Sequence, residues 1–588
     1  MRHFKIDPRS LAVFRIFISI CILWDMTVRL SMGRASLAWY TSENESRYPS
    51  IQASYDTPHS AKIHQLWFYR GSEEFQILCF LITIFLTICF GLGVYAHEGS
   101  IISILLWLSV TAIQNRCTHL NDGSDRFLRC LILWCSFLPM SEVWSIDAYR
   151  HEQHALMKSQ QYISKKNDDA QGNSDQIQGT LDRSNMESNL QKFTRNSSKT
   201  SYCFPRTKDN NSSSVPFSNP INNAASTGLL LQAVLMYLGT VLNRLSGTKW
   251  LPPTLEAVHY AISSTFASRE WSAKHLRLHP TLTKFMTFQA MVIEGLCPIA
   301  CLLVPENWRH IPALVLASLH FGLLIFMRLP QWQVLGIICN ILWLPPNVWN
   351  YLALTRLSSK PLTDQRQHKN HTFDNVYARR RLQISNTVSW CLLCYMLYNF
   401  SGERGWIRKH DNGDIGEFIQ FSQRWVMYGP DPPVYCIATV MTGKVYVNDM
   451  TDMTHVNSPM HIDVLATVRT GKAVFVDIKT LSALLQRPPV AMSAQYPNWR
   501  WENAILKWIR HRERRQSSRI NIHSRFTLLA TFLCRLADDK LTEASSVYSS
   551  SLTEITIYIR HLRIMPPGSL ERFSLLPRSD YVVSTKCR

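Results

Sequence analysis

The stretch FQILCFLITIFLTICFGLGVYA (75–96) decides the fold class, because it runs for about 20 residues without a charged side chain. A helix rises about 1.5 Å per residue, so this length crosses a hydrocarbon core of about 30 Å. Further apolar windows lie at 11–24, 101–113, 127–140, 227–242, 285–304, 310–327, 332–349 and 384–400. One such window fits a buried helix of a soluble protein, but so many together do not. The sequence therefore predicts an all-α polytopic membrane bundle of about nine transmembrane helices.

The overall composition hides these windows, because polar segments dilute them. The chain has 588 residues, is 46% hydrophobic and has a mean hydropathy of only −0.08. Its net charge of +20 would suit nucleic acid, but the sequence contains no recognisable nucleic-acid-binding module. In membrane proteins, excess Lys and Arg gather in cytosolic loops and near lipid headgroups. The predicted partner is therefore the lipid bilayer, and the sequence names no protein partner.

The 15 cysteines give no sign of a metal site. Most of them fall inside apolar windows, where a free Cys behaves as a small hydrophobic residue. Cys391 and Cys394 form a CxxC motif, but they lie within a window and have no partner ligands, so we expect them to pack. No zinc-binding spacing is present.

Basic residues orient the chain. Arg379, Arg380 and Arg381 come directly before the last window, so the positive-inside rule places the loop 356–383 in the cytosol. Counting outward, the N-terminus is cytosolic and the tail after residue 400 is lumenal or extracellular. The first window lacks a clear cleavage site, so we expect it to be retained. The basic segment 507–519 disagrees, although long domains cross membranes largely regardless of charge; a wrongly assigned span would leave the tail cytosolic.

Four regions follow from this pattern. Residues 1–149 hold transmembrane helices 1–4, and residues 227–400 hold helices 5–9. Between them, 150–226 is rich in Ser, Asn, Asp and Lys, so it cannot bury enough apolar surface to fold and is predicted to be a disordered cytosolic insertion. Residues 401–588 form the tail. Among the glycosylation sequons, Asn196 and Asn211 are predicted to be cytosolic and unused, whereas Asn44 and Asn399 are lumenal, Asn399 close to the membrane.

The tail changes to the period of a β-structure. The segments ATVMTGKVYVND (438–449) and ATVRTGKAVFVD (466–477) match over equal lengths, and each predicts a hairpin that turns at Gly443 or Gly471. SLTEITIYIRHLRI (551–564) predicts a further strand, and a helix over 498–515 is expected to pack against this sheet. TGK resembles the end of a phosphate-binding loop, but no GxxxxGK pattern precedes it. We therefore expect a small β-rich extramembrane domain.

Several segments, in order along the chain, resemble the HTTM (horizontally transferred transmembrane) family, which includes the vitamin K-dependent γ-carboxylase. They are IDPRSLAVFRIFISICILWDMTVRL (6–30), NDGSDRFLRCLILWCSFLPMSEVWSIDA (121–148), YLGTVLNRLSGTKW (237–250), EGLCP (294–298), His320, LPQW (329–332), QRWVMYGPDPP (423–433), TGKAVFVDI (470–478) and NWRW (498–501). The tail segments resemble the non-carboxylase branch. The resemblance covers nearly the whole chain except 150–226.

The carboxylase member of this family deprotonates vitamin K hydroquinone and uses the strong base formed on epoxidation to carboxylate Glu. The family's initiating base is a Lys at the position of Arg244. A guanidinium keeps its proton in proteins and cannot act as a general base. Lys249 is a weak alternative. It lies five residues after Arg244, so on a continuing helix its side chain would point away from that of Arg244. It also precedes Trp250, and a Lys-Trp pair at a helix end is typical of an interfacial anchor.

Other polar residues fall inside or beside the windows. Glu294 is costly to bury, so a partner such as Arg244, Arg15 or His320 is expected. His320 is either functional or a neutral imidazole bonded to a neighbouring carbonyl. An i,i+4 helix pair accounts for Asp25 and Arg29. Asn121, Asp122 and Asp125 are expected to cap a helix, and Asp147 to be structural.

These observations favour a multi-pass membrane protein of the endoplasmic reticulum or plasma membrane that lacks the family's γ-carboxylase activity. Its buried polar cluster of Arg244, Glu294 and His320 would bind a lipid-soluble or small anionic ligand, or hold the bundle together. The alternative is an active γ-glutamyl carboxylase-like enzyme with vitamin K hydroquinone as cofactor and a different base. A transporter would require inverted repeats and broken helices, and the sequence shows neither.

Overall fold

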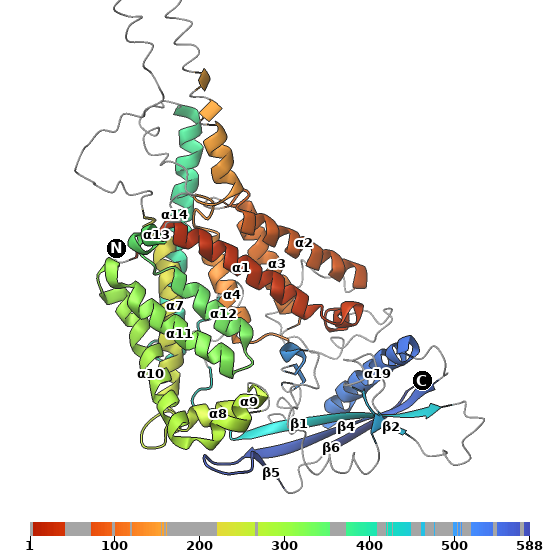
Figure 1. Cartoon of the computed structure of the whole chain (residues 1–588). Helices are drawn as coiled ribbons and strands as arrows, with labels where there is room; N and C mark the ends of the chain where they lie inside the picture. Colours follow the sequence, from red (N-terminus) through yellow and green to blue (C-terminus); the bar gives the residue numbers. More distant parts are fainter. Residues whose placement is uncertain are drawn as a thin grey trace, which may run out of the picture.

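The computed structural model of the chain combines a helical bundle with an antiparallel β-sheet at one end of it (Figure 1). It describes residues 4–41, 72–161, 220–352, 372–408, 419–447, 460–464, 475–476, 498–507, 519–544, 550–576 and 581–587, with a few short gaps inside these ranges. The predicted glycosylation site Asn44 and most of the predicted insertion lie outside the described residues. At the edges of that insertion, residues 146–154 are helical and a long helix begins at Ala224.

Each predicted window overlaps a helix. These are α1 (Pro8–Arg29), α2 (Glu73–Leu92), α3 (Ile101–Arg116), α4 (Gly123–Cys135), α7 (Ala224–Arg244), α10 (Pro280–Leu303), α11 (His310–Phe326), α12 (Pro330–Ile341) and α14 (Thr372–Glu403). The connecting elements are η1 (Gly33–Trp39), α8 (Ala257–Ser263), α9 (Glu270–His275), η5 (Leu276–Leu278), η6 (Glu306–Trp308) and α13 (Pro346–Tyr351). Local signals fix the ends: Asp7 caps α1 just before Pro8, and Asn223 and Ser226 form a capping box on α7.

Among the described residues, 5 helical segments are long and apolar enough to cross a membrane: Pro8–Arg29, Glu73–Leu92, Ala224–Arg244, Pro280–Leu303 and Glu306–Phe326. The other predicted spans are helical but shorter or more polar. The window 332–349 is divided, because α12 ends at Ile341 and Pro345 and Pro346 start the separate helix α13. The predicted count of nine therefore exceeds what length and composition establish.

Several of these helices expose large apolar side chains. On α2 these include Leu81, Ile82 and Phe85; on α10, Phe285, Leu296 and Leu303; on α11, Leu314 and Phe321. Contiguous apolar surface of this kind would be unfavourable in water. The helices indicate a membrane-embedded protein.

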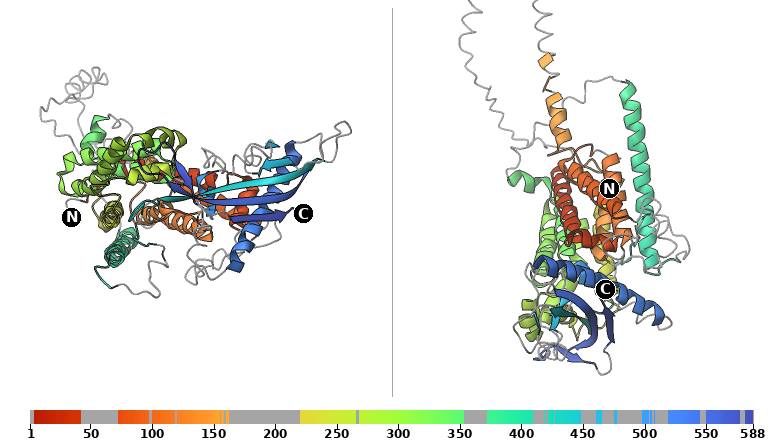
Figure 2. Two further views of the ribbon diagram at one scale, coloured as in Figure 1. Left: turned by 90° about the horizontal axis from the view of Figure 1, so that it is seen from below. Right: turned by 90° about the vertical axis from the view of Figure 1, so that its right-hand side faces the viewer.

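The sheet has the order β3-β2-β1-β4-β5, and β6 also pairs with β4. Its strands are β1 (Tyr435–Val447), β2 (Met460–Asp463), β3 (Phe475–Val476), β4 (Ser550–Ile564), β5 (Phe573–Leu575) and β6 (Tyr581–Lys586). The predicted strand at 551–564 is confirmed as β4. Helix α19 (Arg519–Ala544), which sequence analysis did not predict, lies along one face of the sheet (Figure 2). The helical part of 498–507 contacts both the bundle and α19, since Trp501 packs on Trp39 and Phe532.

The predicted hairpin at 438–449 is wrong. β1 continues through Gly443 and pairs with β4 along its whole length, with a register shift after Lys444. A Cβ on Gly443 would come within 2.5 Å of Leu552 Cδ1 and 2.9 Å of Val464 Cγ2. This glycine is therefore required for close packing over the strand and not for a turn. Apart from β3, the second repeat lies outside the described residues.

Contacts divide the helix ends into two groups. At one end, Ile6 pairs with Ile221 just before α7, and Arg9 Nη1 donates to Asn350 Oδ1 at 2.8 Å. At the other end, which we call the sheet end, the last turns of α1 and α7 and the first turns of α4 and α12 contact the tail. Figure 1 shows the sheet below this second end and the first turns of α14 at the opposite end.

Candidate functional site: buried charges at the sheet end of the bundle

Arg244 ends α7 as a buried cation with three kinds of contact. Its Nη1 donates to Glu294 Oε2 in a buried ion pair, and its Nε donates to Met427 O at 3.2 Å. Its Cζ lies 4.1 Å from the centroid of the Trp250 ring. The partner of Glu294 is thus Arg244. Arg15 instead donates to main-chain carbonyls, including that of Trp144 at 2.6 Å.

His320 is fully buried on α11 and uses both ring nitrogens. Nδ1 lies 2.7 Å from Gln333 Oε1, and Nε2 lies 2.5 Å from the Tyr237 hydroxyl. An amide oxygen only accepts, so Nδ1 carries the proton and Nε2 accepts from Tyr237. This is a satisfied neutral imidazole, bonded to side chains of α7 and α12. Gly336 makes room for it, because a Cβ there would lie 2.6 Å from three ring atoms.

Lys249 belongs to the junction with the tail. Its Nζ lies 3.8 Å from the Tyr260 ring centroid and 3.8 Å from Glu256 Oε2. Its backbone N–H donates to Asp431 Oδ1 at 2.7 Å, and Thr248 N donates to Asp431 Oδ2 at 3.1 Å. The ammonium is engaged by Glu256 and by Tyr260 of α8, which gives no geometry for replacing a base at position 244.

The segments 237–250 and 423–433 pack against each other. Besides the Asp431 contacts, Trp250 Nε1 donates to Tyr428 O at 3.0 Å. A Cβ on Gly247 would lie 2.0 Å from Pro430 O, so the backbones approach as closely as glycine allows. The tail loop is therefore seated directly on the end of α7.

A second buried charge cluster, which sequence analysis missed, lies at the same end of the bundle. Arg29 Nε donates to Asp25 Oδ2 at 2.9 Å, and its Nη2 donates to Asp125 Oδ1 at 2.6 Å. Arg500 of the tail donates to both carboxylates and to Gln331 Oε1. These groups come from α1, α4, α12 and the tail, and all are buried.

The sequence contained only part of this signal. The i,i+4 pair of Asp25 and Arg29 is present, and Asp122 and Asp125 form the predicted cap as a capping box on α4. Nothing in the spacing indicated that Arg500 would join them, because it lies 475 residues from Asp25. Its place in the NWRW motif was the only hint.

The remaining predicted positions are structural. Asp147 Oδ2 accepts from Ala96 N at 3.2 Å. Asn399 is fully buried and bonded to Gln423 N and the Tyr395 hydroxyl, which does not suit a glycosylated side chain. Cys391 and Cys394 are expected to pack, but they are exposed on α14, so they do not pack inside the bundle. Within the described ranges no group of three or more His, Cys, Asp or Glu could hold a metal ion.

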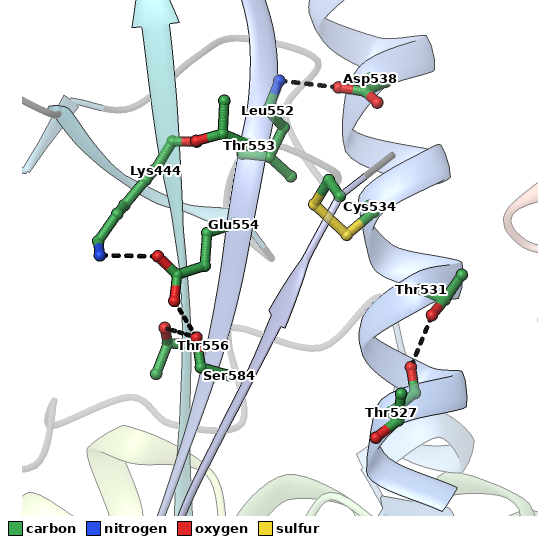
Figure 3. The surroundings of a disulfide bond; sticks show 11 residues. Lys444, Thr527, Thr531, Cys534, Asp538, Leu552, Thr553, Glu554, Thr556 and Ser584 are labelled. Carbon is green, nitrogen blue, oxygen red and sulfur yellow. Dashed lines mark hydrogen bonds and ion pairs between the residues drawn. A yellow bond between two sulfur atoms is a disulfide. The ribbon is translucent and has the colours of Figure 1, made fainter. Parts of the chain in front are cut away.

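The tail contains a disulfide between Cys534 of α19 and Cys587 after β6 (Figure 3). Nearby, Asp538 Oδ1 accepts from Leu552 N at 3.0 Å, and Lys444 Nζ lies 2.7 Å from Glu554 Oε2 across β1 and β4. The disulfide thus joins the helix to the sheet that it covers. Sequence analysis did not predict it.

Comparison with known proteins adds no identification: no protein-family model, no curated protein and no solved structure matches the chain.

Proposed function

We propose that the chain is an HTTM-type integral membrane protein in which the family's base position has become a structural ion pair, so that γ-carboxylation is lost. The observation that carries this proposal is the environment of Arg244. Its guanidinium is held by Glu294, by Met427 O and by the Trp250 ring. A base accepts a proton, so this guanidinium would first have to lose one of its own, and an ion-paired guanidinium does not. The residues at this position do not fit the deprotonation of vitamin K hydroquinone.

The same environment favours a structural role over the binding of a small anion. An anion would compete with Glu294, whose carboxylate would then be left buried without its cation. As placed, Arg244 joins α7 to α10 and to the tail loop at Met427. The pair therefore holds the bundle together and seats the extramembrane domain on it.

Nine membrane crossings are supported by the way that helix ends alternate. α1 begins beside Ile221 and ends beside Asn498 of the tail, whereas α4 begins at the tail and leads back toward Arg15. α7 then returns to the tail, and α12 runs from Gln331 at the tail toward α13, which contacts Arg9. Short helices such as α12 would cross with help from the segments that extend them.

A lumenal or extracellular tail is supported by the disulfide. Disulfides form and persist in oxidising compartments and are rare in the cytosol. The Cys534–Cys587 bond joins α19 to the end of β6, so we assign the tail to the lumen of the endoplasmic reticulum or to the cell exterior.

The test is an assay of microsomes that contain the chain, supplied with vitamin K hydroquinone, bicarbonate and a Glu-rich peptide. We expect neither epoxide nor carboxylated peptide above microsomes that lack the chain, while microsomes with an authentic γ-carboxylase serve as the positive control. Product above background would contradict the proposal and support the enzyme that uses a different base. Activity gained by Arg244→Lys would identify position 244 as a lost base.

A further inference from the structure

We infer that the sheet end of the bundle contains a guanidinium-binding site, and that Arg500 of the tail occupies it. Arg500 Nη1 donates to Asp125 Oδ2 and to Leu120 O, both at 2.8 Å. Its Nη2 donates to Asp125 Oδ1 at 3.0 Å and also to Asp25 and Gln331. Arg500 is 1% exposed. The inference concerns how the tail is attached, and it does not depend on whether the chain carboxylates Glu.

The shape of the site selects a guanidinium. Asp125 accepts from both terminal nitrogens through its two oxygens, which is the fork-to-fork arrangement of an Arg–carboxylate pair. Cζ lies 4.4 Å from the Trp499 ring centroid, so the planar group also stacks. A Lys ammonium is a compact point charge and cannot make the bidentate contact and the stacking contact together.

The charges of the bundle and of the tail are complementary at this site. On the bundle side, the two carboxylates of Asp25 and Asp125 pair with a single guanidinium, that of Arg29. The tail brings one cation, Arg500, which pairs with both carboxylates. Without the tail, this buried region would keep an uncompensated negative charge, which is strongly unfavourable.

The residues on either side of Arg500 also contact the bundle, so the site positions this whole segment of the tail. Asn498 Nδ2 donates to Val28 O at 3.0 Å and to Ser31 Oγ at 2.8 Å, and Trp501 packs edge-on against Trp39 at 5.1 Å between centroids. Trp501 also packs on Phe532 of α19. Arg500 therefore fixes the segment that carries the sheet and α19 to α1, α4 and α12.

The first experiment is chemical rescue of the full chain in detergent. Arg500→Ala should lower the Tm by about 5 °C or more, and 20 mM methylguanidinium should recover at least about half of that loss. Methylammonium at the same concentration should recover none, and Arg500→Lys should resemble Arg500→Ala. Arg563→Ala, which removes an exposed Arg of β4, is the matched control and should leave the Tm unchanged. Equal recovery by both cations, or an unchanged Tm for Arg500→Ala, would overturn the inference.

A second pair of variants covers the case in which Arg500→Ala does not fold. Arg500→Gln leaves one carboxylate unbalanced, and adding Asp25→Asn restores the balance between Arg29 and Asp125. We expect the double variant to give a larger monodisperse peak on size exclusion and a higher Tm than Arg500→Gln alone. A double variant no better than the single one would show that charge compensation does not attach the tail.

Discussion

At the residue scale, Arg244 uses one side chain to hold a carboxylate, a main-chain carbonyl and an indole ring. Removing one partner of a buried ion pair leaves the other charge stranded, at a cost of about 3–5 kcal/mol. We expect Arg244→Ala and Glu294→Ala each to lower the Tm in detergent, and Arg244→Gln with Glu294→Gln to recover part of the loss. Arg244→Lys should be a poor substitute, because an ammonium cannot make all three contacts. Wild-type stability of Arg244→Ala would make this residue a surface anchor.

His320 gives a second test at this scale. In Gly336→Ala, the new methyl group would meet the imidazole at 2.6 Å and push it away from Tyr237 and Gln333. Overpacking of this kind costs about 1–3 kcal/mol, so we expect a lower Tm. The matched control is Gly322→Ala on α11, where no atom lies within 4 Å of the new Cβ. If both variants had the same Tm, the His320 environment would be adaptable rather than tightly packed.

The partner of a buried charged residue could be predicted only where the surrounding sequence showed that a partner was missing. Glu294 in an apolar window demands a partner, and Arg244 was among the few cations available. Asp25 and Arg29 satisfied each other within one helix turn, so nothing in the sequence indicated a further cation. Arg500 could be found only once the fold had brought its segment to α1 and α4.

At the scale of elements, apolar windows predicted helices well, because a membrane-length run of apolar residues has few other stable conformations. The division of 332–349 does have a signal in the sequence, since the consecutive residues Pro345 and Pro346 cannot continue a helix. The β1 strand was harder to predict. A glycine between two β-prone runs is typical of a hairpin, and only the packing of Leu552 and Val464 over Gly443 shows why it lies inside a strand.

The helical segment that carries Arg500 also contains a carboxyl with an unusual environment. Glu502 is 2% exposed, and its Oε2 lies 4.0 Å from Nη1 of Arg328, which lies in the turn before α12. Burial raises the pKa of this carboxyl from 4.5 to about 8, although Arg328 and Arg572 oppose the shift. In that interval the folded protein binds a proton that the unfolded chain releases, so Glu502 makes stability fall as the pH rises from about 4.5 to about 8.

We therefore predict that Glu502→Gln melts several degrees above wild type at pH 8 and that the difference shrinks toward pH 5. The measurement is the Tm of both proteins in detergent at intervals of one pH unit. Glu571→Gln changes an exposed carboxyl of the same domain and should follow the wild-type curve. A constant difference between Glu502→Gln and wild type across this range would show that Glu502 is ionised throughout.

At the scale of the whole molecule, different elements lie at the two ends of the helical bundle. The sheet and α19 lie at one end, and the first turns of α1 and α14 lie at the other (Figures 1 and 2). Both buried charge clusters contact the tail and so belong to the sheet end. The positive-inside rule, applied to the three arginines 379–381, predicts that the sheet end is lumenal or extracellular, and the disulfide supports the same proposal by different chemistry. The agreement matters because helix length alone supports only 5 crossings among the described residues.

Protease protection in sealed microsomes separates these topologies. We expect a tag at the C-terminus to be protected and a tag inserted near Ser174 to be digested. With the proposed nine crossings, an odd number separates the tail from the N-terminus and an even number separates the 150–226 segment from it. Detergent should expose both tags, which confirms that protection came from the membrane. Protection of both tags, or of neither, would contradict the count of nine. Digestion of the C-terminal tag alone would reverse the orientation and place the Cys534–Cys587 disulfide in the cytosol, where such bonds are rare.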